Sequence, residues 1–187
     1  MRRKVIWRGL LAGALPLSLA PATAIIAADY LSVEDAQRAA FAQAGRFVPV
    51  ALALTAEQRR RIDELAGPQP RRGNLRLWKV EQEGAAPAWF FVDEVIGRQD
   101  LITYAVGIGA DGNLTPIEVL SYRESHGGEI RNRAWRSQFA RRADLGTLRF
   151  RADIKNIAGA TLSSEHVTEG VRWIVALWQS VLYVPAP

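Results

Sequence analysis

Apolar residues recur at helical spacing near the end of the chain, and this pattern predicts a final amphipathic helix. Its apolar stripe consists of Val167, Val171, Ile174, Val175, Trp178 and Leu182. Residues three or four positions apart share one face of a helix, so this stripe should pack on a core. Ser163 or Ser164 is expected to cap the helix at its start.

The middle of the chain alternates between β-branched or aromatic residues and turn residues, which is typical of strands. We expect strands over 75–83, 88–96, 101–109 and 114–122. Their short connections indicate antiparallel pairing. Residues 107–112 formally spell a dinucleotide-binding pattern, but the following Asn-Leu-Thr-Pro cannot begin a helix. We therefore predict a hairpin turn there.

Two helices are predicted before the strands. Ser32 begins a helix signature that Gly45 ends, and Thr55 opens a capping box. The second helix should bury Ile62 and Leu65.

An apolar connection or strand is expected between these helices, over 47–54. The chain shows no internal repeat and no sign of a second core. We expect a single α+β domain over 29–187, an antiparallel twisted sheet flanked by helices, with an N-terminal helical pair at about 32–67.

The chain begins with a basic segment followed by an apolar one. Basic residues occupy positions 2–4 and 8, and residues 9–28 carry no charge. This arrangement is typical of a secretory signal peptide, so we predict that residues 1–28 are one, with cleavage around 24–28. An uncleaved membrane anchor is the alternative. Under either interpretation the domain lies outside the cytoplasm, in the periplasm or its equivalent.

The charge balance argues against nucleic acid as a partner. The net charge of +5 includes four basic residues in the first eight positions, and without them 20 basic residues face 19 acidic ones. A nearly neutral domain attracts a phosphate backbone weakly. The sequence has no cysteine, which excludes disulfides, thiolate ligands and a cysteine nucleophile.

Patterns of catalysis and metal binding are missing from the sequence. It contains no nucleophile elbow, no His-Glu-x-x-His and no Walker loop. His126 and His166 are far apart, and neither has ligand spacing. We therefore assign no catalytic residue and no metal ligand.

The segment 156–164 carries the chemistry that we single out. A Gly-Ala-Thr turn opens the last helix, where free N–H groups and the positive end of the helix dipole attract a phosphate. Thr161 is placed where a phosphorylated ligand would be stabilised. The alternative is that Thr161 or Ser163 merely caps the helix.

Ala-Gly-Ala-Thr-Leu-Ser at 158–163 resembles the Ser/Thr-Gly-Ala-Thr-x-Ser/Thr motif of the bacterial FMN-binding domain family. That family includes the covalently flavinylated components of the sodium-pumping NADH:quinone reductase and of the Rnf electron-transport complex. The resemblance is to a smaller, exported, single-domain branch. It implies that an FMN transferase joins FMN through its phosphate to the hydroxyl of Thr161, with Gly159, Ala160, Leu162 and Ser163 around the site.

Two further segments carry the resemblance. Trp135-Arg-Ser-Gln-Phe139 is similar to a family element, and the loop of Glu124, Ser125, His126, Gly127 and Gly128 resembles part of a family loop. The resemblance implies that this loop covers the flavin ring, with His126 touching it. Glycines at 127 and 128 would let the backbone approach a flat ring. An ordinary polar loop after a strand is the alternative.

The match departs from the family at two positions. Lys155 stands where the family often has an acidic residue, six positions before the threonine, and Asp153 lies two residues earlier. Ala158 replaces the small hydroxyl residue. Both changes leave the acceptor hydroxyl of Thr161 in place.

The resemblance implies an exported, FMN-binding electron carrier rather than an enzyme with its own substrate. FMN would be the cofactor, and the partners would be an FMN transferase and a membrane redox protein, with electrons passing to an extracytoplasmic acceptor. One alternative is a non-redox sensory or interaction domain that has lost flavin, which Lys155 favours. Another is a flavin reductase.

Overall fold

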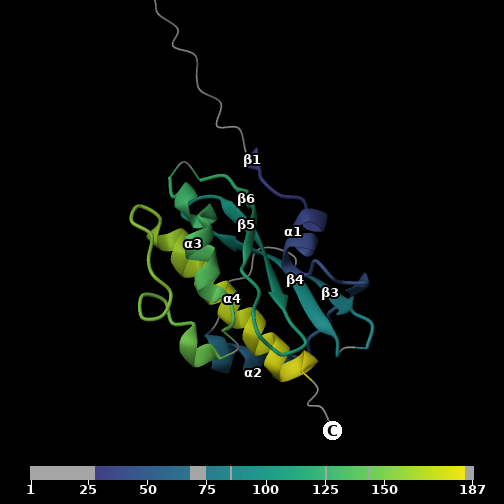
Figure 1. The fold of residues 1–187 in the computed structure, drawn as a ribbon. Helices are drawn as coiled ribbons and strands as arrows, with labels where there is room; N and C mark the ends of the chain where they lie inside the picture. The colour runs from purple at the N-terminus through teal and green to yellow at the C-terminus, as the bar shows by residue number, and fades with distance from the viewer. Residues whose placement is uncertain (1–27, 68–74, 85, 125, 143, 184–187) are drawn as a thin grey trace, which may run out of the picture.

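The computed structural model describes residues 28–67, 75–84, 86–124, 126–142 and 144–183. Six strands form one antiparallel sheet with helices on both faces (Figure 1). The strands are β1 (Ala28–Asp29), β2 (Arg46–Val50), β3 (Arg76–Glu81), β4 (Ala88–Ile96), β5 (Leu101–Ile108) and β6 (Glu118–Tyr122). Their order is β1-β6-β5-β4-β3-β2. The α+β fold class and the four predicted central strands are confirmed, with some strand ends shorter than expected.

The helical elements are α1 (Val33–Ala40), α2 (Ala56–Ala66), η1 (Gly128–Arg131), α3 (Arg133–Arg136), η2 (Ser137–Phe139), η3 (Leu145–Thr147), α4 (Thr161–Leu177) and the π-helical turn η4 (Trp178–Leu182).

The long helix α4 covers one face of the sheet. The predicted apolar stripe of α4 is buried against β4, β5 and α2, apart from Leu182, which is half-buried. Together they form the larger of two apolar cores.

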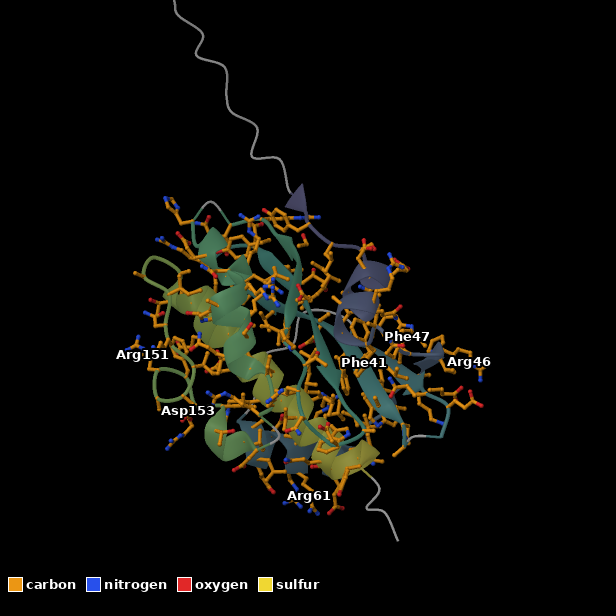
Figure 2. The ribbon with its side chains drawn as sticks, viewed as in Figure 1. Phe41, Arg46, Phe47, Arg61, Arg151 and Asp153 are labelled. Carbon is orange, nitrogen blue, oxygen red and sulfur yellow. The ribbon has the colours of Figure 1, made fainter. Side chains whose placement is uncertain are left out.

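The helix α1 packs on the opposite face of the sheet, over β5 and β6. Ala36 is its buried contact with a smaller core of β3 to β6 residues. Phe41 and Phe47 extend this core beside α1, with ring centroids 6.3 Å apart (Figure 2). The two N-terminal helices, α1 and α2, therefore lie on different faces of the sheet. The strand β2 connects them along the chain and forms one edge of the sheet.

Burial and turn geometry settle two of the sequence-based predictions. Ile62 of α2 is fully buried as expected, but Leu65 is 45% exposed and Ala66 is buried in its place. The turn after β5 is the predicted hairpin, because Ile108 pairs with Leu114 and no helix begins there.

The predicted signal peptide lies almost entirely outside the described residues, which begin at Ala28. Within the part of the chain that the structure describes, none of the helices is both long and apolar enough to cross a membrane.

The contact between α4 and β5 depends on a glycine. A Cβ atom at Gly170 would lie 2.1 Å from the Tyr104 hydroxyl oxygen and 3.0 Å from a methyl of Val95. The Tyr104 hydroxyl donates a hydrogen bond to the buried carboxylate of Asp93 at 2.7 Å, so it has little freedom to move.

We therefore expect Gly170→Ala to lower the free energy of unfolding by about 1–3 kcal/mol, because overpacking outweighs the roughly 0.5–1 kcal/mol gain in helix propensity. Urea unfolding followed by circular dichroism measures this loss. In a Tyr104→Phe background the same substitution should cost less, since the clashing oxygen is gone. Equal costs in both backgrounds would contradict this explanation.

Candidate functional site

The Gly-Ala-Thr turn leads directly into α4, and Thr161 is the first residue of the helix. Gly159 has a positive φ of 82°, a conformation that suits glycine. Ala160 is the N-cap, and no side chain caps the helix. The expected cap by Ser163 or Ser164 is wrong, because both residues lie inside the first turn and are buried. The first N–H groups of α4 therefore have neither an intrahelical acceptor nor a side-chain cap.

The loop after β6 packs against this helix start. A Cβ atom at Gly127, whose φ is 91°, would lie 2.4 Å from the Cβ of Ala160 and 2.6 Å from the Tyr122 hydroxyl. That hydroxyl donates to the carbonyl of His126 and lies 3.3 Å from the hydroxyl of Ser163. Gly127 is thus required for the approach of two protein segments to each other. Ser125 lies outside the described residues.

Glu124 ties the same loop to the turn between β4 and β5. One of its carboxylate oxygens accepts hydrogen bonds from the backbone N–H of Gln99, at 2.6 Å, and of Asp100, at 3.0 Å. Gly97 leaves room for this oxygen, which would be 2.5 Å from a Cβ atom there. The Glu124 carboxylate is therefore engaged in holding the wall of the site.

These three segments enclose a cavity of about 550 Å³, which is within the range of ligand pockets. The cavity is lined by Arg98, Gln99, Glu124, His126, Gly159, Ala160, Thr161, Leu162 and Ser163. All five residues predicted around the Gly-Ala-Thr turn line it, together with two from the loop. Gly127 and Gly128 do not, and Gly128 instead begins η1.

The cavity combines features that suit a phosphorylated, partly apolar ligand. The first turn of α4 carries no acidic residue. Among the residues that line the cavity, Arg98 is positively charged and Glu124 is negatively charged, and the Glu124 carboxylate accepts hydrogen bonds from the backbone of Gln99 and Asp100. Leu162 offers an apolar side chain that is 44% exposed. Thr161 is half-exposed at the first position of the helix. These residues fit a flavin nucleotide whose phosphate lies at the helix start.

Arg98 and Gln99 were not predicted as site residues, because they belong to a hairpin connection. Nothing in the local sequence places that connection against the start of α4, more than 60 residues later. The pairing of β4, β5 and β6 and the packing of α4 on β4 and β5 do so. Nor did the sequence pattern indicate a role for Asn156, whose amide nitrogen lies 3.2 Å from the Thr161 hydroxyl oxygen.

The Trp135-x-x-Gln-Phe element supports the segment before the turn. The indole N–H of Trp135 donates to the carbonyl of Lys155 at 2.8 Å, and the Gln138 side chain accepts from the N–H of Lys155 at 2.9 Å. Asp153 is engaged elsewhere: the side chain of Arg149 donates to its carboxylate, a hydrogen bond that lowers the pKa of Asp153. Figure 2 shows Asp153 near Arg151, in the segment between η3 and α4.

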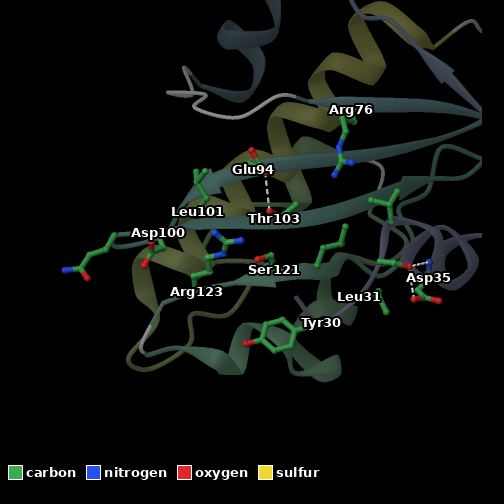
Figure 3. A pocket seen from close by; sticks show the side chains of 14 residues that line it. Tyr30, Leu31, Asp35, Arg76, Glu94, Asp100, Leu101, Thr103, Ser121 and Arg123 are labelled. Atoms are coloured by element: carbon green, nitrogen blue, oxygen red, sulfur yellow. Dashed lines mark hydrogen bonds between the residues drawn. The ribbon is translucent and has the colours of Figure 1, made fainter. Parts of the chain in front are cut away.

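A larger groove of about 760 Å³ lies on the α1 side of the sheet (Figure 3). Arg76, Glu94, Thr103, Ser121 and Arg123 are among its lining residues, and Glu94 accepts a hydrogen bond from Thr103 at 3.3 Å. None of the predicted site residues lines this groove. Among the residues that the structure describes, no group of three His, Asp or Glu side chains could hold a metal ion.

Residues 97–176 match the model of the FMN-binding domain family. The match spans β5, β6, the loop that follows and nearly all of α4, so it contains every residue named above as lining the cavity. Comparison with curated proteins found no match, and neither did comparison with solved structures.

This segment of the chain therefore belongs to the FMN-binding domain family, and the protein contains an FMN-binding domain.

Burial of Tyr122 gives a pH-dependent prediction. Burial raises the pKa of the Tyr122 phenol above its usual 10.0. The fold thus favours the protonated phenol, and the stability this contributes is present below pH 10 and is lost as the pH rises through the raised pKa. We expect the melting temperature to fall less between about pH 9 and pH 11 in Tyr122→Phe than in the wild type.

Thermal melts followed by circular dichroism across this range test the prediction. Tyr183→Phe, at a side chain that is 52% exposed, is the matched control and should keep the wild-type fall. Identical pH profiles for the wild type and Tyr122→Phe would show that Tyr122 does not contribute.

Proposed function

We infer that this protein binds FMN covalently, through a phosphate ester to the Thr161 hydroxyl, and acts as an exported electron carrier. The observation that carries the proposal is the position of this hydroxyl: it lines the cavity at an uncapped helix start, inside the segment that matches the FMN-binding domain family. An uncapped N-terminus of a long helix stabilises a phosphate through its free N–H groups.

The attachment is a phosphoryl transfer to an alcohol. The Thr161 oxygen forms a bond to phosphorus while a phosphoanhydride bond of a flavin dinucleotide breaks, and a nucleoside monophosphate leaves. The hydroxyl proton passes to the FMN transferase that catalyses the step. Ala160 and Ser163 are buried and fix the backbone around the acceptor oxygen, while Leu162, Arg98 and His126 form the walls toward which the ligand extends.

The electron-transfer role rests on the chemistry of the cofactor. FMN supplies one- and two-electron redox chemistry, and the protein supplies binding and tuning. A flavin that is covalently held cannot diffuse away outside the cytoplasm. We therefore place the domain between a membrane donor and an extracytoplasmic acceptor. Lys155 favours a second function, a sensory or interaction domain without flavin, because the family often has an acidic residue there.

Mass spectrometry of the exported protein tests the attachment. Co-expression with an FMN transferase should raise the intact mass by about one FMN less one water. Thr161→Ala should abolish the increase, because it removes the acceptor oxygen.

Thr147→Ala, in the outer turn η3, is the matched control and should keep the added mass. Added mass that persists in Thr161→Ala would move the attachment, with Ser163 the next acceptor to test. No added mass in the wild type would favour the domain without flavin.

The proposed export predicts a shortened mature chain. Residues 1–24, or up to 28, should be missing after secretion, because a basic start and an apolar run mark a signal peptide. N-terminal sequencing of the purified protein measures this directly. A chain that starts at Met1 and stays in the membrane fraction would instead establish an anchor.

A further inference from the structure

We propose that Asn156 is a positioning residue for flavin attachment, which orients the Thr161 hydroxyl oxygen toward the incoming phosphate. This inference rests on the proposed function. The amide nitrogen of Asn156 donates a hydrogen bond to the Thr161 hydroxyl oxygen at 3.2 Å. Within the part of the chain that the structure describes, no other side chain donates a hydrogen bond to that oxygen.

The opposite end of the same amide is also held. The fully buried Ser164 hydroxyl lies 3.0 Å from the side-chain oxygen of Asn156. Its single hydrogen is shared between this oxygen and the backbone carbonyls of Ala160, at 2.9 Å, and Thr161, at 3.0 Å. The Asn156 side chain thus bridges two hydroxyls, one at the first position of α4 and one three residues later. In this arrangement the amide –NH₂ group faces the Thr161 oxygen, and the amide oxygen faces Ser164.

The backbone beside Asn156 is fixed as well. Trp135 donates a hydrogen bond to the carbonyl of Lys155, and Gln138 accepts one from its N–H. These two bonds hold the backbone in place immediately before Asn156. The role of the Trp-x-x-Gln element in this protein follows from these contacts. It places the amide that reaches Thr161, although the element itself does not line the cavity.

Threonine needs such a partner at this position. In a helix its side chain divides between two rotamers, and only one places the oxygen beside Asn156. The hydrogen bond from the amide favours that rotamer. It also leaves the hydroxyl proton of Thr161 free to depart during the transfer. The ester oxygen that results still accepts the same hydrogen bond, so the contact fits both reactant and product.

The experiment measures orientation and attachment separately on the full mature chain. Three-bond couplings to the Thr161 methyl carbon, measured by NMR without flavin, report its χ1 angle. The rate of mass increase with purified FMN transferase and flavin adenine dinucleotide reports attachment. Asn156→Ala should change the couplings from one rotamer to an average and slow attachment roughly three- to tenfold, the effect of losing one hydrogen bond.

The loss should fall on kcat and leave KM for the acceptor protein unchanged, because orientation of the attacking oxygen matters in the reaction step. Asn113→Ala, in the turn after β5, is the matched control and should behave as the wild type. Ser164→Ala keeps the amide donor and should slow attachment less than Asn156→Ala. Since Asn156 is exposed, its variant should stay folded by far-UV circular dichroism.

An unchanged rate in Asn156→Ala would overturn the proposal, and so would Thr161 couplings that do not change. A rise in KM with unchanged kcat would also overturn it, since that result indicates a binding surface. If the wild type gains no mass, the proposed function fails instead. In that case the couplings still decide whether Asn156 orients the hydroxyl.

Discussion

The burial of α4 on the sheet is the constraint on which the site depends. Most of this helix is inaccessible to solvent, including the positions that face β4, β5 and α2. A helix held this firmly cannot shift along its axis without breaking the core, because interiors are close-packed. Its first residue, Thr161, is therefore fixed in space relative to the ends of β4 and β6.

Short polar contacts then close the site around that fixed point. Glu124 attaches the loop after β6 to the β4–β5 turn, and Tyr122 attaches the same loop to the start of α4. Gly127 permits the approach because any larger side chain would meet Ala160. Residues that the family resemblance places near a flavin thus also hold three segments of the protein together.

Sequence periodicity predicted the helices and strands themselves better than which of their residues are buried or lie at a helix end. The apolar stripe of α4 and the four central strands follow from local patterns, since spacing of 3.6 or 2 residues decides which side chains share a face. Leu65 was placed wrongly because the neighbouring Ala66 also suits a buried face. The serines at 163 and 164 were placed as caps because serine favours that position, yet α4 begins earlier, at Thr161.

By itself the sequence determined the fold class, the Gly-Ala-Thr turn and the identity of Thr161 as the acceptor to test, because each depends on residues close together in the chain. The cavity was decided only by the tertiary structure. Arg98, Glu124 and Thr161 come from three distant segments. Antiparallel pairing of β4, β5 and β6 brings the first two together, and the packing of α4 on β4 and β5 places the start of α4 beside them. The contact from Asn156 likewise depends on the fold, because distant side chains at Trp135 and Gln138 hold the backbone before it.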